Sequence, residues 1–197
     1  MLAYYRASVS RRDIREVWVG PLPAENEPIL IVDYDPDWPR LFAREEKRIR
    51  RALAHRVLAL EHVGSTAVPG LPAKSRIDID LTVADSGDEG AYLPLLEAVG
   101  YVLVIREPDW HEHRVLKGPD TDVNLHVFSP GTPELERHRR FRDWLRANDA
   151  DRQLYALTKR ELAGATWRYT DDYAAAKSAV IGEILQRATD AKPSADR

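Results

Sequence analysis

The sequence contains no cysteine, and this absence excludes disulfide bonds, zinc–thiolate sites, iron–sulfur clusters and thiol catalysis. The N-terminus has no apolar run long enough for a signal peptide or a membrane-spanning helix. A strong excess of basic residues is also missing, because the formal net charge is −3. The global positive field that drives nucleic-acid binding is therefore excluded. Together these absences predict a cytoplasmic protein that makes no membrane contact.

Two short basic stretches do not change this charge balance. RRDIR and ERHRRFR are brief, and each contains an acidic residue. A nucleic-acid partner normally requires a basic face or stripe of greater extent. We therefore expect the partner to be a small molecule.

The remaining composition is that of an ordinary globular protein, with 44% hydrophobic and 31% charged residues among 197. This length fits one domain, or one core with an appended helical part. Weak periodicity indicates that residues 1–28 are an N-terminal extension. We expect a mixed α/β core over residues 29–130, with C-terminal helices over residues 131–190 packed on it as one globular unit.

The apolar periodicity predicts an α+β fold in which helices gather at one end. Helical spacing predicts an amphipathic helix over residues 35–54, a short helix over 92–99, and three helices after Thr132, the last two over about 150–163 and 171–188. Alternating patterns predict strands over residues 56–63, 75–83 and 101–106, followed by a hairpin in which HRVLKG and VNLHVFS flank PDTD.

The stretch SRIDIDLTV contains two aspartates, Asp78 and Asp80, on a predicted strand. Residues two apart on a strand point to the same face, so their Cα atoms lie roughly 7 Å apart. Carboxylate oxygens suit Mg²⁺ or Mn²⁺, and two such ions can clamp the attacking and leaving oxygens of a phosphoryl-type transfer. A solvent-facing edge strand would also tolerate this pattern.

A glycine-containing turn, Gly64-Ser65-Thr66, precedes these aspartates by about a dozen residues. Glycine lets backbone N–H groups approach an anion, and the two hydroxyl groups add hydrogen-bond donors. Lys74 and Arg76 follow in the same loop and would offset phosphate charge. A phosphate-binding turn that leads to Asp-x-Asp predicts a site for a nucleotide and its metal.

The stretch HVGSTAVPGLPAKSRIDIDLTV resembles the signature of the GrpB family. Three further stretches are similar to that family: VDYDPDWPRLFAREEKRI, NLHVFSPGTPELERHRRFRDWLRAN and YALTKRELA with YAAAKSAVIGEIL. The resemblance covers about residues 29–188. It implies a fold like that of the DNA polymerase β-type nucleotidyltransferases: a small mixed sheet with helices on one side and a C-terminal helical part.

The resemblance also implies roles for individual residues. Asp78 and Asp80 would bind Mg²⁺, and Gly64 and Ser65 would meet the nucleotide phosphates. Family members also occur fused to dephospho-CoA kinase, which keeps open a role as a non-catalytic accessory or binding module of the same fold.

The sequence departs from the superfamily pattern at the third carboxylate, which is expected on a later strand. The strand VNLHVFS has His126 where an aspartate is expected. Imidazole is a poorer ligand for Mg²⁺ than for Mn²⁺, but it can act as a general base toward the incoming nucleophile. Asp120 and Asp122, at the entrance to this strand, are the alternative third acids.

Three more residues are candidates for nucleotide contact. Arg114 can bind phosphate or a carboxylate through its planar guanidinium group. Tyr173 and Lys177 share a face of the last predicted helix at i, i+4 spacing, as do Tyr155 and Lys159 on the preceding helix. Packing between helices is the alternative role for both tyrosines.

Other polar residues are interpreted as structural. His62 lies beside the Gly-Ser turn and is expected to be a hydrogen-bonded core histidine. His111 and His113 would share a strand face, which would allow metal binding, but we expect a solvated hairpin edge or a nucleotide contact instead. Arg142 and Arg146 have the spacing of a solvated helix face.

Together these residues and the resemblance predict a metal-dependent nucleotidyltransferase, which would move a nucleoside monophosphate from a nucleoside triphosphate to a small-molecule acceptor. The acceptor pocket is expected between the sheet and the C-terminal helices. Two alternatives to this function stay open: the accessory module, and a two-metal phosphohydrolase that uses the same acids.

Overall fold

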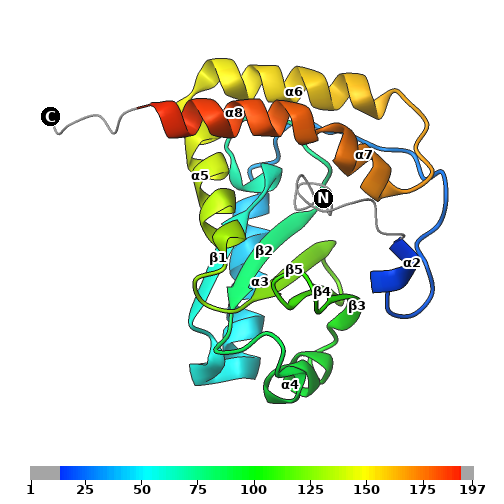
Figure 1. Ribbon diagram of the computed structural model, residues 1–197, viewed down its shortest axis with the longest axis vertical. Helices are drawn as coiled ribbons and strands as arrows, with labels where there is room; N and C mark the ends of the chain where they lie inside the picture. Colours follow the sequence, from blue (N-terminus) through cyan, green and yellow to red (C-terminus); the bar gives the residue numbers. More distant parts are fainter. Residues whose placement is uncertain (1–13, 192–197) are drawn as a thin grey trace, which may run out of the picture.

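A five-stranded mixed sheet forms the centre of the computed structural model, which describes residues 14–191 (Figure 1). The strand order is β1-β2-β5-β4-β3; β2 and β5 pair in parallel, and the other three neighbouring pairs are antiparallel. The bounds are Ala59–Val63 for β1, Ile77–Thr82 for β2, Val102–Glu107 for β3, His113–Lys117 for β4 and Val123–Phe128 for β5. The predicted α+β class and the hairpin over β4 and β5 are confirmed.

Seven α-helices surround this sheet in the described part of the chain. They are α2 (Ile14–Val17), α3 (Trp38–Leu53), α4 (Leu93–Glu97), α5 (Pro133–Ala147), α6 (Asp149–Ala163), α7 (Thr170–Ala176) and α8 (Ser178–Asp190), with short 3₁₀ turns η1 (Ala54–Arg56), η2 (Ser65–Ala67) and η3 (Glu89–Ala91). None of these helices is both long and apolar enough to cross a membrane.

One predicted helix is divided in two. The helix expected over residues 171–188 is interrupted at Lys177, which separates α7 from α8. The backbone N–H of Lys177 bonds to the carbonyl of Ala174, three residues earlier, at 3.2 Å. This tighter turn breaks the regular α-helical ladder, and the periodicity of the sequence carries no sign of it.

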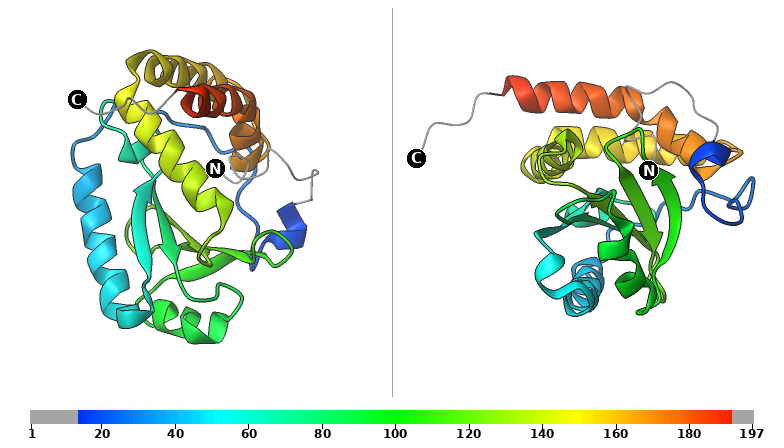
Figure 2. Two further views of the ribbon diagram at one scale, coloured as in Figure 1. Left: turned by 60° about the vertical axis from the view of Figure 1, so that its left-hand side comes forward. Right: turned by 60° about the horizontal axis from the view of Figure 1, so that its bottom comes forward.

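The two faces of the sheet differ in character. On one face, Ile77, Ile79 and Leu81 of β2 join a core formed with Ile49 and Leu53 of α3. The opposite face carries the polar side chains of β2 and is approached by α5, so the sheet lies between α3 and α5 (Figure 2). Apolar burial therefore holds β2 in place from one side and leaves the other side for chemistry.

A second apolar cluster packs the C-terminal helices onto one another and onto the end of β5. Its buried members include Phe128 of β5, Phe141 of α5, Tyr155 of α6 and Ile181 of α8. Helices α6 and α8 run side by side across one end of the molecule (Figures 1 and 2). Helices α5 to α8 thus form a layer above the polar face of the sheet, which we call the helical roof.

The described part of the N-terminal extension docks on the outer strand of the sheet. Trp18 forms an antiparallel bridge with Ile105 of β3, and the N–H of Val19 bonds to the carbonyl of Val104 at 2.9 Å. Val17 is buried against Ile105. The segment thereby covers an edge that would otherwise be exposed. Residues 1–13 of the predicted extension lie outside the described residues.

Candidate functional site

Asp78 and Asp80 project from the same face of β2, as the alternation predicts. They are nearly inaccessible, with 2% and 3% of their surface exposed, and so do not stand in an open cleft. Their neighbours across the parallel ladder are Asn124 and His126 of β5, respectively. The four polar side chains of β2 and β5 therefore form a buried surface, and a ligand that contacts them must enter between the sheet and the helical roof.

Asp78 is held in a hydrogen-bonded row that runs across the strands. Lys117 Nζ donates to Asn124 Oδ1 at 2.7 Å, and Asn124 Nδ2 donates to Asp78 Oδ1 at 3.0 Å. Burial raises the pKa of Asp78 to about 6, against the opposing effect of the nearby positive charge on Arg76. A carboxylate in this position costs folding free energy, which a bound cation would offset.

Asp80 has a different partner. His138 of α5 lies with its Nδ1 atom 2.7 Å from Asp80 Oδ2, although the two residues are 58 positions apart in the chain. Within the described residues, Asp80 Oδ1 is buried and has no hydrogen-bond partner. A buried carboxylate oxygen that lacks a partner is costly, and it marks a place where an ion or ligand would bind.

The Gly64-Ser65 turn lies directly against Asp78. Gly64 has a φ of +71°, and a Cβ atom added there would be 2.5 Å from Asp78 Oδ2. Lys159 Nζ donates to Ser65 Oγ at 3.1 Å. Thr66 is buried, and its hydroxyl donates to the carbonyl of Arg76 at 3.0 Å, so its hydroxyl proton is used within the protein. Glycine is required here by both conformation and space.

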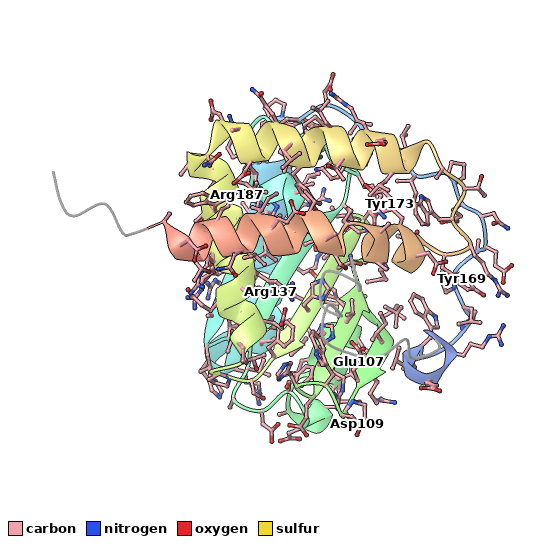
Figure 3. All side chains as sticks on the ribbon, turned by 45° about the horizontal axis from the view of Figure 1, so that its top comes forward. Glu107, Asp109, Arg137, Tyr169, Tyr173 and Arg187 are labelled. Atoms are coloured by element: carbon pink, nitrogen blue, oxygen red, sulfur yellow. The ribbon has the colours of Figure 1, made fainter. Side chains whose placement is uncertain are left out.

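A small pocket of about 40 Å³ opens between this turn, β2 and helices α6 to α8. We call it the cationic pocket; its polar lining residues are Ser65, Lys74, Arg76, Asp78, Lys159, Tyr173 and Lys177. Four of these side chains are cationic and one is a carboxylate. Tyr173 of α7 lies beside the C-terminal helices (Figure 3), with Lys177 Nζ 4.5 Å and Lys74 Nζ 5.6 Å from its ring centroid.

The lysines of the cationic pocket outnumber its negative charges, because Asp78 is the one carboxylate among its described lining residues. Among the described residues, no carboxylate forms an ion pair with Lys74, Lys159 or Lys177. Burial lowers the pKa of Lys177 to about 8, and burial together with the charges of Arg76 and Lys177 lowers the pKa of Lys74 to about 7. Burial also lowers the pKa of Lys159 well below its ordinary value. A bound anion would relieve this repulsion, and phosphate is the anion that such a cluster suits.

The pocket brings together six residues that the sequence predicts for nucleotide or metal contact. They are Ser65, Lys74, Arg76, Asp78, Tyr173 and Lys177. Lys159 completes the set; its helical spacing with Tyr155 was the only signal for it in the sequence. Nucleotide contact by these residues remains a prediction.

Arg114 does not join this set, contrary to prediction. Its guanidinium group is directed to the opposite face of β4, where Nε contacts Glu89 Oε1 at 2.5 Å. It also donates to the carbonyl of Glu112 at 2.7 Å. A guanidinium group does bind a carboxylate here, but that carboxylate belongs to the protein itself.

His126 ends a buried chain of hydrogen bonds across three strands. His113 Nδ1 is 2.9 Å from Glu107 Oε2, and His113 Nε2 is 3.1 Å from His126 Nδ1. Burial lowers the pKa of both histidines. With Glu107 ionised and His113 neutral, the protons lie on Nδ1 of both rings, which makes Nε2 the basic atom of His126. Glu107 lies on the sheet below the helical roof (Figure 3).

Other predictions for this region are corrected by the structure. His111 does not share a strand face with His113, because it lies in the turn before β4 with a φ of +55°. The alternative third acids, Asp120 and Asp122, are already engaged, since their carboxylates bond to Arg48 and Arg76.

The predicted solvated face of α5 in fact clamps this helix to the sheet. Arg142 donates to Glu61 at 2.8 Å and to the carbonyl of His62, and Arg146 donates twice to the carbonyl of Ala67. His62 is a buried structural histidine, as expected, and burial lowers its pKa to about 3. These contacts position α5, and with it His138, above Asp80.

The donor set suits a metal only in part. Within residues 14–191, no group of three histidine or acidic side chains lies close enough to hold a metal ion. Asp78 and Asp80 nevertheless offer two carboxylates, one with an oxygen that lacks a partner. Mg²⁺ is commonly bound by one or two carboxylates together with substrate phosphates and water. The residues therefore fit Mg²⁺, or Mn²⁺, whose remaining ligands come with a phosphate chain.

We expect sulfate binding to the cationic pocket to weaken about tenfold as the pH rises from 6 to 9. Sulfate keeps its charge over this range, whereas Lys74 loses its proton near pH 7 and Lys177 near pH 8. Ionisation of Asp78, which also faces Lys74, acts in the same direction. Calorimetric titration measures the affinity. In Lys74→Met, binding at pH 6 should be weaker and its decline should move to higher pH; an affinity that stays constant from pH 6 to 9 in the unmodified protein contradicts this interpretation.

The comparisons with known proteins agree on one family. The family model for GrpB proteins matches residues 28–187. A UPF0157 protein from Halalkalibacterium halodurans is 60% identical over 176 residues, which is 89% of this chain and 90% of that protein. The solved structure of GrpB from Enterococcus faecalis is 31% identical, covers 81% of this chain and 96% of that one, and superimposes with a TM-score of 0.70.

Another solved structure is similar at a much lower level. The Cid1 poly(U) polymerase is 11% identical, with 75% of this chain and 45% of that chain covered and a TM-score of 0.39. The family match covers the whole sheet and the helical roof, including the Gly-Ser turn and both β2 aspartates. The chain belongs to the GrpB family.

Proposed function

We propose that this protein is a metal-dependent nucleotidyltransferase, which moves a nucleoside monophosphate from a nucleoside triphosphate to a small-molecule acceptor. The observation that supports this most is the cationic pocket, where four cationic side chains meet the Asp78 carboxylate. A site with only cations would suit any anion. The Asp78 carboxylate in its lining, with Asp80 two residues further along the same face of β2, suits an anion that arrives with a divalent metal.

Each part of the site has its own task in this proposal. Ser65 and the lysines bind the phosphate chain, and Arg76 neutralises its charge. Asp78 and Asp80 hold Mg²⁺ or Mn²⁺, and this ion, when bound, neutralises charge on the phosphate oxygens. The Lys117–Asn124–Asp78 row fixes the orientation of the first carboxylate. His138 does the same for the second.

His126 is the general base for the acceptor. It neighbours Asp80 on the adjacent strand, and the Glu107–His113 pair sets its tautomer so that Nε2 can receive a proton. The acceptor hydroxyl or amine would attack the α-phosphorus in line, and pyrophosphate would leave. In this proposal His126 replaces the third carboxylate, so the site has one metal ligand fewer and one general base more.

We expect metal and nucleotide to bind together. Mg²⁺ alone should leave the melting temperature unchanged, since the described part of the chain offers two carboxylates and no cluster of three metal-binding side chains. A nucleoside triphosphate with Mg²⁺ should raise it by several degrees, and more than the nucleotide with EDTA. A thermal-shift series over the four ribonucleotides with Mg²⁺ or Mn²⁺ measures this, and ³¹P NMR of a positive combination identifies the products.

The same series separates the alternatives. Nucleotide binding that ignores Mg²⁺, or no binding at all, would contradict the proposal and indicate an accessory module. Release of nucleoside monophosphate in the absence of any acceptor would indicate a phosphohydrolase instead.

A further inference from the structure

The segment of residues 17–27, which we call the strap, is fixed at both ends. At one end Trp18 pairs with Ile105 of β3, and its indole N–H donates to the carbonyl of Pro21 at 2.7 Å. At the other end Glu25 accepts hydrogen bonds from Arg168 at 2.8 Å and from the Tyr169 hydroxyl at 2.7 Å. Tyr169 precedes α7 and lies beside the N-terminal segment (Figure 3). The strap therefore spans from the sheet to the helical roof.

A cavity of about 270 Å³ lies beneath the strap, and it is much larger than the cationic pocket. Its walls are mostly apolar: Trp18 and Pro23 come from the strap, Ile105 and Val115 from the sheet, and Tyr169 from the roof. His126 also lines it. We call this space the strap cavity.

The strap cavity and the cationic pocket adjoin each other. Arg76 lines both, and Asn124 of the strap cavity bonds to Asp78 of the cationic pocket. A phosphate chain in one space and an acceptor in the other would therefore meet beside Asp78, with His126 on the acceptor side.

Three polar side chains of the lining, Asn124, Lys117 and Arg76, already form hydrogen bonds within the protein. Asn124 bridges Lys117 and Asp78, and Arg76 donates to Asp122 at 2.8 Å. A polyhydroxylated ligand would lose water here without gaining equivalent hydrogen bonds. The walls instead favour a flat ring or a branched aliphatic group.

We propose that the strap cavity is the acceptor site, and that the acceptor is a small, largely apolar molecule that carries one hydroxyl or amine at the end facing His126. This assignment rests on the proposed nucleotidyl transfer. The acceptor oxygen or nitrogen forms a bond to the α-phosphorus, the bond from that phosphorus to the β-phosphate oxygen breaks, pyrophosphate leaves with the electron pair, and the proton passes to His126. Since the family match begins at residue 28, the outer wall of this site is built outside the matched region.

The probe for this proposal is tyrosol, an uncharged molecule with one aromatic ring, a phenolic hydroxyl at one end and an aliphatic hydroxyl at the other, titrated without nucleotide into the full ¹⁵N-labelled chain. The indole signal of Trp18, assigned with Trp18→Phe, should shift in a saturable way. Ala24→Trp places a large side chain at an exposed lining position of the strap and should weaken tyrosol binding at least tenfold. Leu22→Trp is the matched control, because Leu22 is 41% exposed on the same strap and does not line the cavity.

Glucose at equal concentration tests the class of ligand, and it should leave the Trp18 signal unchanged. The absence of a saturable shift with tyrosol, an equal effect of both tryptophan variants, or glucose binding as tight as tyrosol binding would overturn the proposal. The thermal shift with nucleotide and Mg²⁺ is measured on the same samples and should persist in Ala24→Trp. If that shift is present while tyrosol fails, the acceptor assignment alone is wrong; if tyrosol binds but no nucleotide does, the proposed function and the acceptor role fall together.

Discussion

Replacement of Asp80 or Asp78 by asparagine should lower the rate of nucleotidyl transfer by about 10³-fold or more. Each change removes one of the two carboxylates available to the metal, and metal stabilisation of the transferring phosphoryl group is worth several kcal/mol. The side chain keeps its size, and its remaining oxygen can still accept from Asn124 in Asp78→Asn or from His138 in Asp80→Asn. The ³¹P NMR assay with the nucleotide identified by thermal shift measures the rate.

Stability measurements separate this loss from unfolding. The pKa of Asp78 is raised to about 6, above its value of about 3.9 in an unfolded chain, so its charged form destabilises the fold at pH 8. Asp78→Asn should therefore leave the free energy of unfolding in urea unchanged or raise it by up to about 3 kcal/mol. The matched control is Asp120→Asn, which removes a surface partner of Arg48 and should leave the rate unchanged. Turnover that survives in both β2 variants would exclude the mechanism.

The sequence was sufficient to predict the part of the site that is local in the chain. Strict alternation over β2 places Asp78 and Asp80 on one face whatever surrounds the strand, because the period is a property of the backbone. The Gly-Ser turn and the loop lysine follow within the same stretch. This region contains the residues that carry the resemblance to the GrpB family.

The remainder of the site depends on contacts between distant segments. Lys159 reaches Ser65 across 94 positions, and His138 reaches Asp80 across 58. His138 occupies a core-facing position of its amphipathic helix, and a histidine among apolar residues on such a face is the signal that could have identified it. The periodicity of the sequence does not predict which strand the core-facing side of α5 will contact.

The face of a strand on which a residue lies also decides whether its side chain can reach the site, and two adjacent residues of β4 show this. Arg114 and Val115 are adjacent on β4, so one points to Glu89 and the other into the strap cavity. A prediction from residue type alone assigned Arg114 to the site, because a guanidinium group suits phosphate. The register of β4 on β5 overrides this preference, with Val115 and not Arg114 opposite His126.

Substitution of Gly64 by alanine is expected to destabilise the protein by about 3 kcal/mol, and the cost should divide into two parts. A φ of +71° costs an alanine about 1–2 kcal/mol, and a Cβ atom 2.5 Å from Asp78 Oδ2 forces further movement that costs about 1–3 kcal/mol. Gly70→Ala is the matched control, because Gly70 has a φ of +75° with no atom within 4 Å of the added Cβ. Urea unfolding of both variants measures the difference, which is the cost of the contact with Asp78.

A double variant tests whether this contact has been correctly identified. In a background of Asp78→Ala the carboxylate is absent and only the Cβ atom at 3.1 Å remains, so most of the extra cost of Gly64→Ala over Gly70→Ala should disappear. Equal destabilisation by the two glycine substitutions in the unmodified protein would show that Gly64 serves only the turn. A larger cost at Gly64 that disappears with Asp78 would show that the turn must lie directly against the carboxylate. The proposed function requires this closeness, because the turn would present the phosphate chain to a metal ion held by Asp78.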